Sequence, residues 1–371
     1  RSGGYSPPDL QQFRDSTAIA DVAIINSGQH RSMVERSLAQ LGLNADISAA
    51  QCESGSLSHS LRRLRAGIRA CLVESSANWV VAQGDTSTAY ATALAARDLG
   101  LRLAHVEAGL RTNHPLRPFP EEHFRRRIAR LAALHFAPSA SAERNLRAEG
   151  IDPARIHRVG QTSIDVLRKA LKHPIAEAEL PPLPPTRHLI VLTLHRRENY
   201  GRGLDVVCTA LLDLLAKRAD VGVLCPLPPN PAVGARIRQH LGAHPRVALT
   251  QPLDFHPFIT LLSRAALAIT DSGGIQEEAP YLGTPILIAR ENTERPESLA
   301  LGSANLVAVD AASIVCAAER LLCAPRPTPI AFSLHSPYGD GHAGRRIAEY
   351  LTATSEFAVT NDAAMPLALS A

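Results

Sequence analysis

The sequence predicts an α/β protein built from two domains with parallel sheets. Its 371 residues are enough for two domains, each with its own core. Two stretches about half a chain apart, 79–109 and 265–297, repeat one order of features. Each has an apolar strand, a turn with Asp and a hydroxyl residue, a helix, a Leu-Gly pair, and a second strand followed by an acidic residue. Since ligands of parallel sheets bind at the carboxyl ends of strands, we expect the two copies to face each other across a cleft.

Proline content marks the expected domain boundary. Residues 174–185 hold five prolines and no periodic pattern, which is typical of an interdomain linker. We therefore expect residues 1–173 to form an N-terminal Rossmann-like domain and residues 186–342 a C-terminal one. The amphipathic pattern of the last predicted helix, within 343–353, favours packing back on the N-terminal domain.

In the N-terminal half, short apolar runs predict strands and a 3.6-residue periodicity predicts helices. One helix, for example, would place Met33, Val34, Leu38 and Leu41 on a single face. The prolines of residues 111–122 predict a loop that leads into a helix. The predicted strands are 22–25, 79–83, 101–106 and 135–137, and the predicted helices are 33–41, 61–73, 89–97, one starting at 121, 142–149 and one running through 172.

The C-terminal half opens on an uninterrupted apolar strand, 189–194, as in buried parallel sheets. Gly283 predicts the end of a helix over 275–281. The prolines within 226–231 exclude a helix there. The other predicted strands are 221–224, 247–250, 266–270, 284–289 and 306–309, and the other predicted helices are 204–216, one ending at 263, 311–322 and 343–351.

Composition excludes several classes of function. Hydrophobic residues make up 45% of the chain and charged residues 20%, as in a soluble globular protein. A formal net charge of +4, without basic blocks interleaved with aromatics, fits an anionic small ligand and not nucleic acid. The six cysteines form no CxxC pair and no His/Cys cluster at metal spacing, and no apolar run approaches the length of a membrane span. We expect a cytoplasmic protein without a metal site.

The stretch 265–297 carries a turn suited to a phosphate group. Ser272, Gly273 and Gly274 lie where a predicted strand gives way to a helix. Glycines let a ligand approach the backbone, and a helix N-terminus offers unpaired N–H groups and the positive end of the dipole. Glu278, one turn into the helix, and Arg295, after the next strand, can reach the same cleft. The alternative is an ordinary βαβ unit with a polar loop.

Four further polar residues follow predicted strands or open a helix: Asp85, Glu107, Glu121 and His195. Three of them have structural alternatives. Asp85 could be a helix N-cap, Glu121 a favourable carboxylate of a first turn, and His195 an exposed base in a loop. Together, three carboxylates and an imidazole around an anion-binding turn indicate acid–base chemistry on a phosphorylated ligand.

Residues 339–344, GDGHAG, fit the G-x-G-x-x-G pattern of dinucleotide sites. They follow Ser336-Pro337-Tyr338 and not a strand, so the required βαβ context is missing. We therefore expect no nicotinamide site. The sequence also holds no Walker loop, zincin helix or nucleophile elbow.

Eight segments resemble, in order along the chain, the motifs of bacterial non-hydrolysing UDP-N-acetylglucosamine 2-epimerases. They read QGDTST, HVEAGLRT, PFPEE, LHFAP, LHRREN, DSGGIQEEAP, ENTERPE and SPYGDG, within about residues 29–351. The resemblance implies a GT-B-like fold, in which two Rossmann-type domains with parallel sheets face each other across a cleft that holds the active site. It also implies a homodimer and a C-terminal domain that binds the nucleotide.

The reaction implied by the resemblance interconverts UDP-N-acetylglucosamine and UDP-N-acetylmannosamine without a cofactor, for a surface polysaccharide or another glycan. Because C2–H of the sugar is not next to a carbonyl, simple deprotonation is very unfavourable. The family instead eliminates UDP to give 2-acetamidoglucal and adds UDP back with protonation from the opposite face. This route needs proton carriers on both faces of the ring and donors that retain the diphosphate.

By similarity, the catalytic residues are Asp85, Glu107, Glu121 and His195, and the substrate-binding residues are Arg1, Phe258, Ser272, Gly273, Gly274, Glu278 and Arg295. Asp85 and Glu121 would carry protons, with Glu107 and His195 in supporting roles. Ser272 to Gly274 and Arg295 would hold the diphosphate. Glu278 would bind the ribose and Phe258 would lie at the uracil.

The sequence also departs from the family pattern. Arg1 is in register with the Arg of Gly-Thr-Arg-Pro-Glu, but the first strand, the rest of that motif and a following Lys are missing or diverged. Pro228 stands where many members have a His that helps bind a second, activating UDP-N-acetylglucosamine. These departures keep three alternatives open: a hydrolysing 2-epimerase, an epimerase of a related UDP-diacetamido-uronate, and a non-catalytic protein that binds a nucleotide sugar.

Overall fold

The computed structural model describes residues 22–29, 34–35, 38–39, 42–50, 56–112, 114, 118–173, 175–196 and 200–360, with side chains described as far as residue 353. Arg1, which was expected to contact the substrate, lies outside the described residues, and so does part of the predicted helix 33–41.

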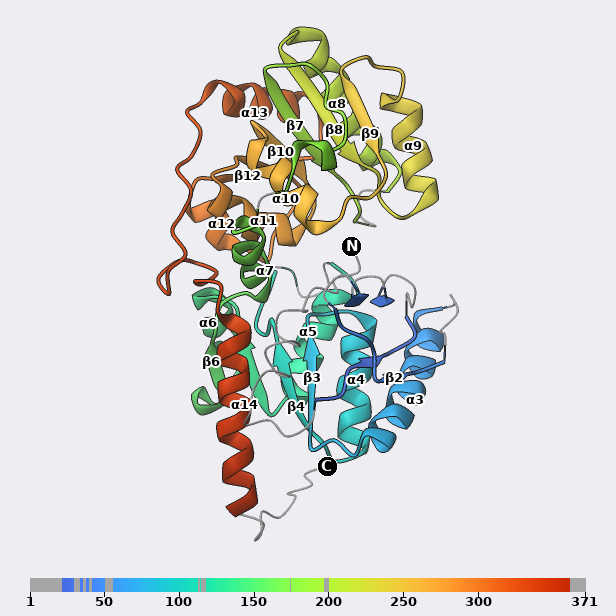
Figure 1. Cartoon of the computed structure of the whole chain (residues 1–371), viewed down its shortest axis with the longest axis vertical. Helices are drawn as coiled ribbons and strands as arrows, with labels where there is room; N and C mark the ends of the chain where they lie inside the picture. Colours follow the sequence, from blue (N-terminus) through green and yellow to red (C-terminus); the bar gives the residue numbers. More distant parts are fainter. Residues whose placement is uncertain are drawn as a thin grey trace.

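Four parallel strands form the sheet of the N-terminal half, in the order β3-β4-β5-β6 (Figure 1). They are β3 (Trp79–Gln83), β4 (Arg102–Val106), β5 (Leu134–Ala137) and β6 (Ile156–Arg158). A separate parallel pair joins β1 (Ile25–Asn26) to β2 (Ile47–Ser48). The helices of this half include α3 (Leu57–Ser75), α4 (Ser87–Asp98), α5 (Glu121–Leu131), α6 (Ala140–Ala148) and α7 (Thr162–Leu171), with a 3-10 turn at Pro153–Arg155.

Six parallel strands form the second sheet, in the order β12-β11-β10-β7-β8-β9. They are β7 (His188–Thr193), β8 (Val221–Pro226), β9 (Val247–Thr250), β10 (Leu267–Thr270), β11 (Ile286–Ala289) and β12 (Ala304–Val307). The chain starts in the middle, builds outward on one side and returns to build outward on the other. The strand order therefore reverses between β7 and β10, which is where open α/β sheets bind ligands.

Helices cover the second sheet and connect it to the first half. A 3-10 turn, Glu177–Glu179, lies in the connection that leads to β7. The helices that follow are α8 (Arg202–Lys217), α9 (Pro231–Leu241), α10 (Phe255–Arg264), α11 (Gly273–Leu282), α12 (Pro296–Ala300), α13 (Ala311–Cys323) and α14 (Ala343–Thr360). Within the described residues, no helix is long and apolar enough to cross a membrane.

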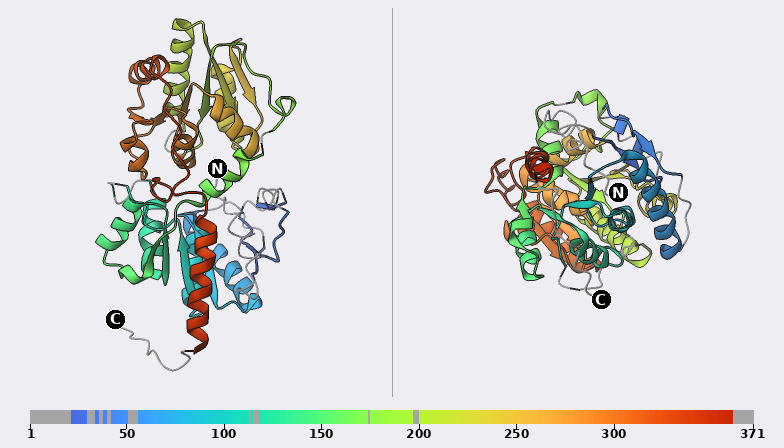
Figure 2. Two further views of the ribbon diagram at one scale, coloured as in Figure 1. Left: turned by 60° about the vertical axis from the view of Figure 1, so that its left-hand side comes forward. Right: turned by 90° about the horizontal axis from the view of Figure 1, so that it is seen from below.

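Two helices pack on the opposite half from the one in which the sequence order places them. In α7, Ile164 and Leu167 are fully buried in the apolar cluster that α10 and α11 form with the second sheet. Conversely, α14 follows the second sheet but runs along the first half (Figures 1 and 2), where Ile347 and Leu351 pack with Phe136 of β5. The two facing parallel sheets form a GT-B-like fold, as the sequence predicts.

The differences from the predicted elements are local. Three elements, β2, β6 and α12, were not predicted, because each has five residues or fewer and is too short for a periodic pattern. Helix α9 was also missed. The prolines were expected to exclude a helix through 231, but Pro231 is the first residue of α9. Proline is tolerated there because that position has no intrahelical N–H partner, and Asn230 caps the helix by accepting from the N–H of Ala232 at 3.1 Å.

The packing of α14 can be tested by stability measurements. Ile347→Ala should lower the free energy of unfolding by about 2–5 kcal/mol, because a fully buried side chain leaves a cavity. Trp79 is the single tryptophan and packs against the same cluster, so its fluorescence in urea reports on this half. Glu349→Ala, on the exposed side of α14, should change stability by no more than about 0.5 kcal/mol. Equal losses in the two variants would contradict the packing.

Candidate functional site

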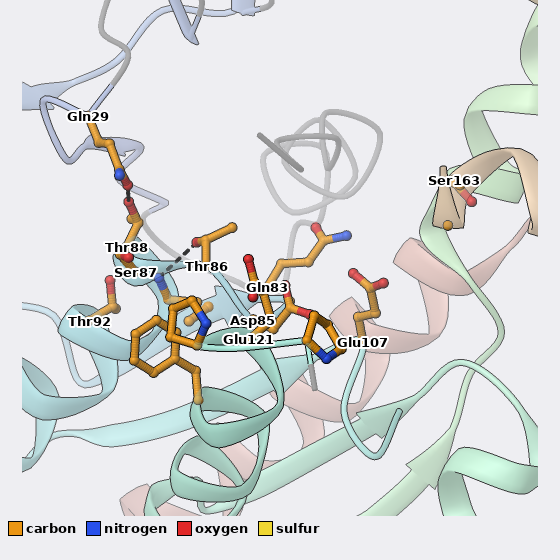
Figure 3. Close-up of a pocket in the computed structure, with 18 of the residues that line it drawn as sticks. Gln29, Gln83, Asp85, Thr86, Ser87, Thr88, Thr92, Glu107, Glu121 and Ser163 are labelled. Atoms are coloured by element: carbon orange, nitrogen blue, oxygen red, sulfur yellow. Dashed lines mark hydrogen bonds between the residues drawn. The ribbon is translucent and has the colours of Figure 1, made fainter. Parts of the chain in front are cut away.

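One cavity of about 2220 Å³ lies between the two halves and is lined from both. All four residues predicted to be catalytic line it: Asp85, Glu107, Glu121 and His195. Ser272, Gly273, Gly274, Glu278 and Arg295 line the same cavity. Figure 3 shows Asp85, Glu107 and Glu121 grouped at one rim, contributed by the N-terminal half. These nine predicted residues therefore line one cavity.

Asp85 follows β3 and pairs with a buried arginine. Its carboxylate lies 2.5 Å from Nη2 of Arg125 in α5. The N-cap of α4 is the next residue, Thr86, whose Oγ1 accepts from the N–H of Ala89 at 3.2 Å. The N-cap alternative for Asp85 is therefore wrong. Glu121 is the first residue of α5, so a favourable interaction with the helix dipole and a role in the cavity are both open to it.

Glu107 has an unfavourable backbone conformation and a largely buried carboxyl group. Its φ is +63°, a left-handed conformation that costs a residue with a Cβ about 1 kcal/mol or more. Its carboxylate lies 3.0 Å from Nη2 of Arg295 across the cavity. The pKa of Glu107 is raised to about 7: burial is the main cause, the charges of Glu277 and Asp85 act in the same direction, and those of Arg295 and Arg125 oppose the rise. A carboxyl that titrates near neutral pH can both accept and donate a proton there.

His195 follows β7 and is oriented by a buried carboxylate. Asp271, which follows β10, accepts from the backbone N–H of His195 at 3.1 Å and of Arg196 at 3.0 Å. The imidazole Nδ1 lies 3.1 Å from the same carboxylate. Both strands of the topological switch point thus contribute to one Asp–His pair, which fixes the imidazole at the cavity wall. His195 is therefore a positioned side chain of the cavity, and the alternative of an exposed base in a loop does not describe it.

Arg295 lies against the first turn of α11. A Cβ at Gly273 would be 2.6 Å from the guanidinium carbon, so only glycine leaves room for the arginine. Its Nε donates to Glu277 at 2.6 Å. Glu277 in turn accepts from Gln161 at 2.8 Å and Ser163 at 3.1 Å, both from the α7 region. The cation at the expected diphosphate position is therefore held from both halves.

A second buried carboxylate, Glu294, sits among four guanidinium groups. Burial alone would raise its pKa, yet these neighbouring positive charges hold it well below its usual value. They belong to Arg295, Arg196, Arg290 and Arg125. Two of these arginines also pair with other carboxylates, Arg125 with Asp85 and Arg295 with Glu277, so this wall of the cavity is a network of ion pairs.

Phe258 is placed differently from the expectation. Its side chain is 4% exposed and packs in the apolar core with Ile259 and Leu262, and it does not line the cavity. Phe255, at the start of α10, does line it. The apolar pattern of α10 has two phenylalanines three residues apart, and the sequence could not tell which one faces the core. Glu278 is 2% exposed and lines the cavity, as expected for a ligand-binding carboxylate.

His105 supports the two strand ends that carry Asp85 and Glu107. It lies in β4, is 1% exposed, and its Nε2–H donates to the carbonyl of Gly84 at 2.8 Å. Burial lowers its pKa to about 4, with the charges of Arg111 and Arg125 acting in the same direction. The ring is therefore neutral at pH 7 and joins the two turns by a hydrogen bond.

Sequence reasoning missed the residues that hold the predicted ones in place. Asp271 was assigned only to a turn, and Arg125, Glu277 and Glu294 were not singled out. Several of their partners are remote in sequence, and no local pattern identifies those contacts. Two local signals existed. Glu122 and Arg125 are spaced for an i,i+3 ion pair, which the structure forms at 2.9 Å. Arg290 and Glu294, four residues apart, pair at 3.1 Å.

Both a family profile and individual proteins of known sequence relate this chain to UDP-N-acetylglucosamine 2-epimerases. A family profile described as UDP-N-acetylglucosamine 2-epimerase matches residues 13–352. The chain is 37% identical to the UDP-N-acetylglucosamine 2-epimerase of Salmonella typhimurium over 334 residues, which cover 88% of this chain and 89% of that protein.

Solved structures of UDP-GlcNAc 2-epimerases are also similar to this chain. The UDP-GlcNAc 2-epimerase from Neisseria meningitidis bound to UDP-GlcNAc is 30% identical, with a TM-score of 0.83 and coverage of 93% of this chain and 95% of that one. The enzyme of Methanocaldococcus jannaschii in complex with UDP-GlcNAc and UDP is 29% identical, with a TM-score of 0.83 and coverage of 94% and 95%. These similarities extend over both halves of the chain.

The buried histidine gives a testable pH dependence. The folded pKa of His105, about 4, lies below the unfolded value of about 6.5, so the unfolded state binds more protons between these values. Stability is then lost as the pH falls below about 6.5. Between pH 7 and pH 5 this loss is about 2 kcal/mol for one such group. His105→Asn should remove that part of the wild-type loss in urea unfolding, whereas His335→Asn on the surface should not. Identical pH profiles for wild type and His105→Asn would contradict the assignment.

Proposed function

Because the chain belongs to the UDP-N-acetylglucosamine 2-epimerase family, we propose that it interconverts UDP-N-acetylglucosamine and UDP-N-acetylmannosamine by the non-hydrolysing route. One observation carries the proposal. A carboxyl that titrates near pH 7, Glu107, and a glycine-lined helix N-terminus suited to a diphosphate line the same cavity and are bridged by Arg295.

Nucleotide binding is assigned to the C-terminal half. The backbone N–H groups at Gly273 and Gly274 and the dipole of α11 favour a diphosphate, and Arg295 adds a full positive charge. Glu278, four residues after Gly274, is suited to accept hydrogen bonds from ribose hydroxyls. The two relatives whose structures hold UDP-GlcNAc, from N. meningitidis and M. jannaschii, support this choice of ligand.

The carboxyl groups of the cavity can carry out the proton transfers of the reaction. A base removes the C2 proton, a double bond forms between C1 and C2, and the C1–O bond breaks with its electron pair going to the diphosphate. In the return step UDP adds to C1 and an acid delivers a proton to the other face of C2. We assign one of these proton transfers to Glu107, in place of the supporting role implied by the resemblance, because its pKa of about 7 permits both directions. Asp85 or Glu121 serves the opposite face, and the His195–Asp271 pair positions the sugar.

The expected assembly and location stay predictions. A homodimer and a cytoplasmic protein are inferred from the family resemblance and the sequence alone. The hydrolysing route differs only in that water, and not UDP, adds to C1, so the products of the reaction decide between the two routes.

Incubation with UDP-N-acetylglucosamine in deuterated water, followed by NMR, tests the function. We expect deuterium at C2 in both UDP-sugars and a mixture of the two, because protonation of the intermediate draws on solvent. Free N-acetylmannosamine and UDP would favour the hydrolysing route. No exchange in a protein that binds UDP would favour the non-catalytic alternative.

Removal of the proton carrier should separate chemistry from binding. Glu107→Gln keeps the shape of the side chain and should lower kcat by about 10²–10⁴-fold, while stabilisation by UDP in a thermal shift assay persists. Glu349→Gln, on the surface of α14, is the matched control and should keep wild-type kcat. A Glu107→Gln variant with wild-type turnover would exclude the assigned proton transfer.

A further inference from the structure

Each side of the Arg295 guanidinium meets a different carboxylate. Nε donates to Glu277 at 2.6 Å, Nη1 to Glu294, and Nη2 to Glu107 at 3.0 Å. The first two acceptors belong to the same half as the arginine, whereas Glu107 reaches it from the opposite half. The contact with Glu107 is therefore the one that a ligand entering the cleft can replace.

The same guanidinium already lies where an anion would bind. It contacts the first residue of α11, since a Cβ at Gly273 would approach Nη1 to 2.5 Å. A helix N-terminus carries partial positive charge, so a cation beside it is stabilised by an anion and not by the helix. Glu107 supplies part of that negative charge in the structure described here. A diphosphate at the first turn of α11 would compete with Glu107 for one cation.

The groups that face Glu107 come from four elements. Arg295 precedes α12, Glu277 lies in α11, Asp85 follows β3 and Arg125 lies in α5. The two positive charges are already committed elsewhere, Arg125 to Asp85 and Arg295 to Glu277. If Arg295 turns toward a diphosphate, Glu107 is left in a largely buried place with the carboxylates of Glu277 and Asp85 and with added negative charge from the ligand. Such surroundings favour the protonated form of an acid.

We propose that Arg295 is a shared cation: a nucleotide diphosphate bound at the first turn of α11 draws the guanidinium from Glu107, and Glu107 takes up a proton in response. The inference rests on the proposed nucleotide site and adds to it a coupling between nucleotide binding and protonation. The proton comes from solvent when free UDP binds. During turnover it comes from C2 of the sugar.

This coupling would link the two bonds that break in the elimination. When the C1–O bond breaks, the diphosphate gains one negative charge and attracts Arg295 more strongly. At the same moment the proton affinity of Glu107 rises, which is when it must hold the proton taken from C2. One guanidinium thus transmits charge from the leaving group to the base, and the reverse holds when UDP adds back.

Isothermal titration calorimetry with UDP tests the coupling in the full chain. At pH 8 free UDP is fully ionised, because the second pKa of a phosphate monoester is about 6, and Glu107, with a pKa of about 7, is mostly ionised. Titrations in phosphate and in Tris, which differ in ionisation enthalpy, give the number of protons taken up. We expect uptake of about 0.4 proton per UDP if the pKa of Glu107 rises by one unit, and more for a larger rise.

Two carboxamide variants show whether the proton goes to Glu107. Glu107→Gln should bind UDP with no proton uptake at pH 8. Glu291→Gln is the matched control, since Glu291 lines the same cavity and has no assigned role in the reaction, and it should keep the wild-type uptake. Uptake that persists in Glu107→Gln, or UDP binding without uptake by the wild type, would overturn the coupling while leaving the nucleotide site intact. Absence of UDP binding by the wild type would instead overturn the proposed function itself.

A third variant tests whether Glu277 sets the pH at which UDP binding causes proton uptake. Glu277→Gln preserves the side-chain shape that meets Gln161 and Ser163 but removes a negative charge that raises the pKa of Glu107. The pH at which uptake is greatest should therefore shift downward. A purely structural role for Glu277 would weaken UDP binding without moving that profile, and this result would contradict the electrostatic assignment.

Discussion

The ion pair between Arg295 and Glu107 is the contact on which the organisation of the site depends. It crosses from one half of the molecule to the other at 3.0 Å and joins residues 188 positions apart. A buried guanidinium needs a full set of anionic or polar partners, and removal of one partner of a buried pair costs about 3–5 kcal/mol. The end of β4 and the start of α11 must therefore be brought together for either residue to be accommodated.

The other contacts near the cleft are polar as well. Glu277 accepts from Gln161 and Ser163, and Ser141 donates to Glu297, whereas the apolar contact with the second sheet is made by α7. Polar contacts exchange readily with water and ligand, but apolar burial does not. The molecule thus has a firm apolar attachment at α7 and a cleft whose walls are held by exchangeable ion pairs and hydrogen bonds. This division allows a ligand to replace contacts at the site without loss of the fold.

The sequence predicted the fold, and it predicted residues that line one cavity, because both are encoded locally. Apolar strands followed by polar residues identify strand ends, and parallel sheets bring such ends to one edge. The same locality explains the errors. Glu277 and Glu278 are neighbours on one helix with both side chains buried, and only the tertiary structure shows that one holds Arg295. Phe258 was assigned to the uracil from the family resemblance, and only the packing shows that it faces the core while Phe255 lines the cavity. The pairing of Arg295 with Glu107 has no local signal at all.

Glu107 breaks three local rules at once, and this combination argues for function over stability. Its backbone is left-handed where glycine would be unstrained, its acid is largely buried, and its neighbours include two other carboxylates. Each feature alone is unfavourable, and glycine or a neutral side chain would relieve them. The surroundings compensate only in part: Arg295 and Arg125 oppose the rise in its pKa but do not cancel it. A carboxyl poised between its two protonation states contributes little to folding, but it suits a site that must remove a proton and return it.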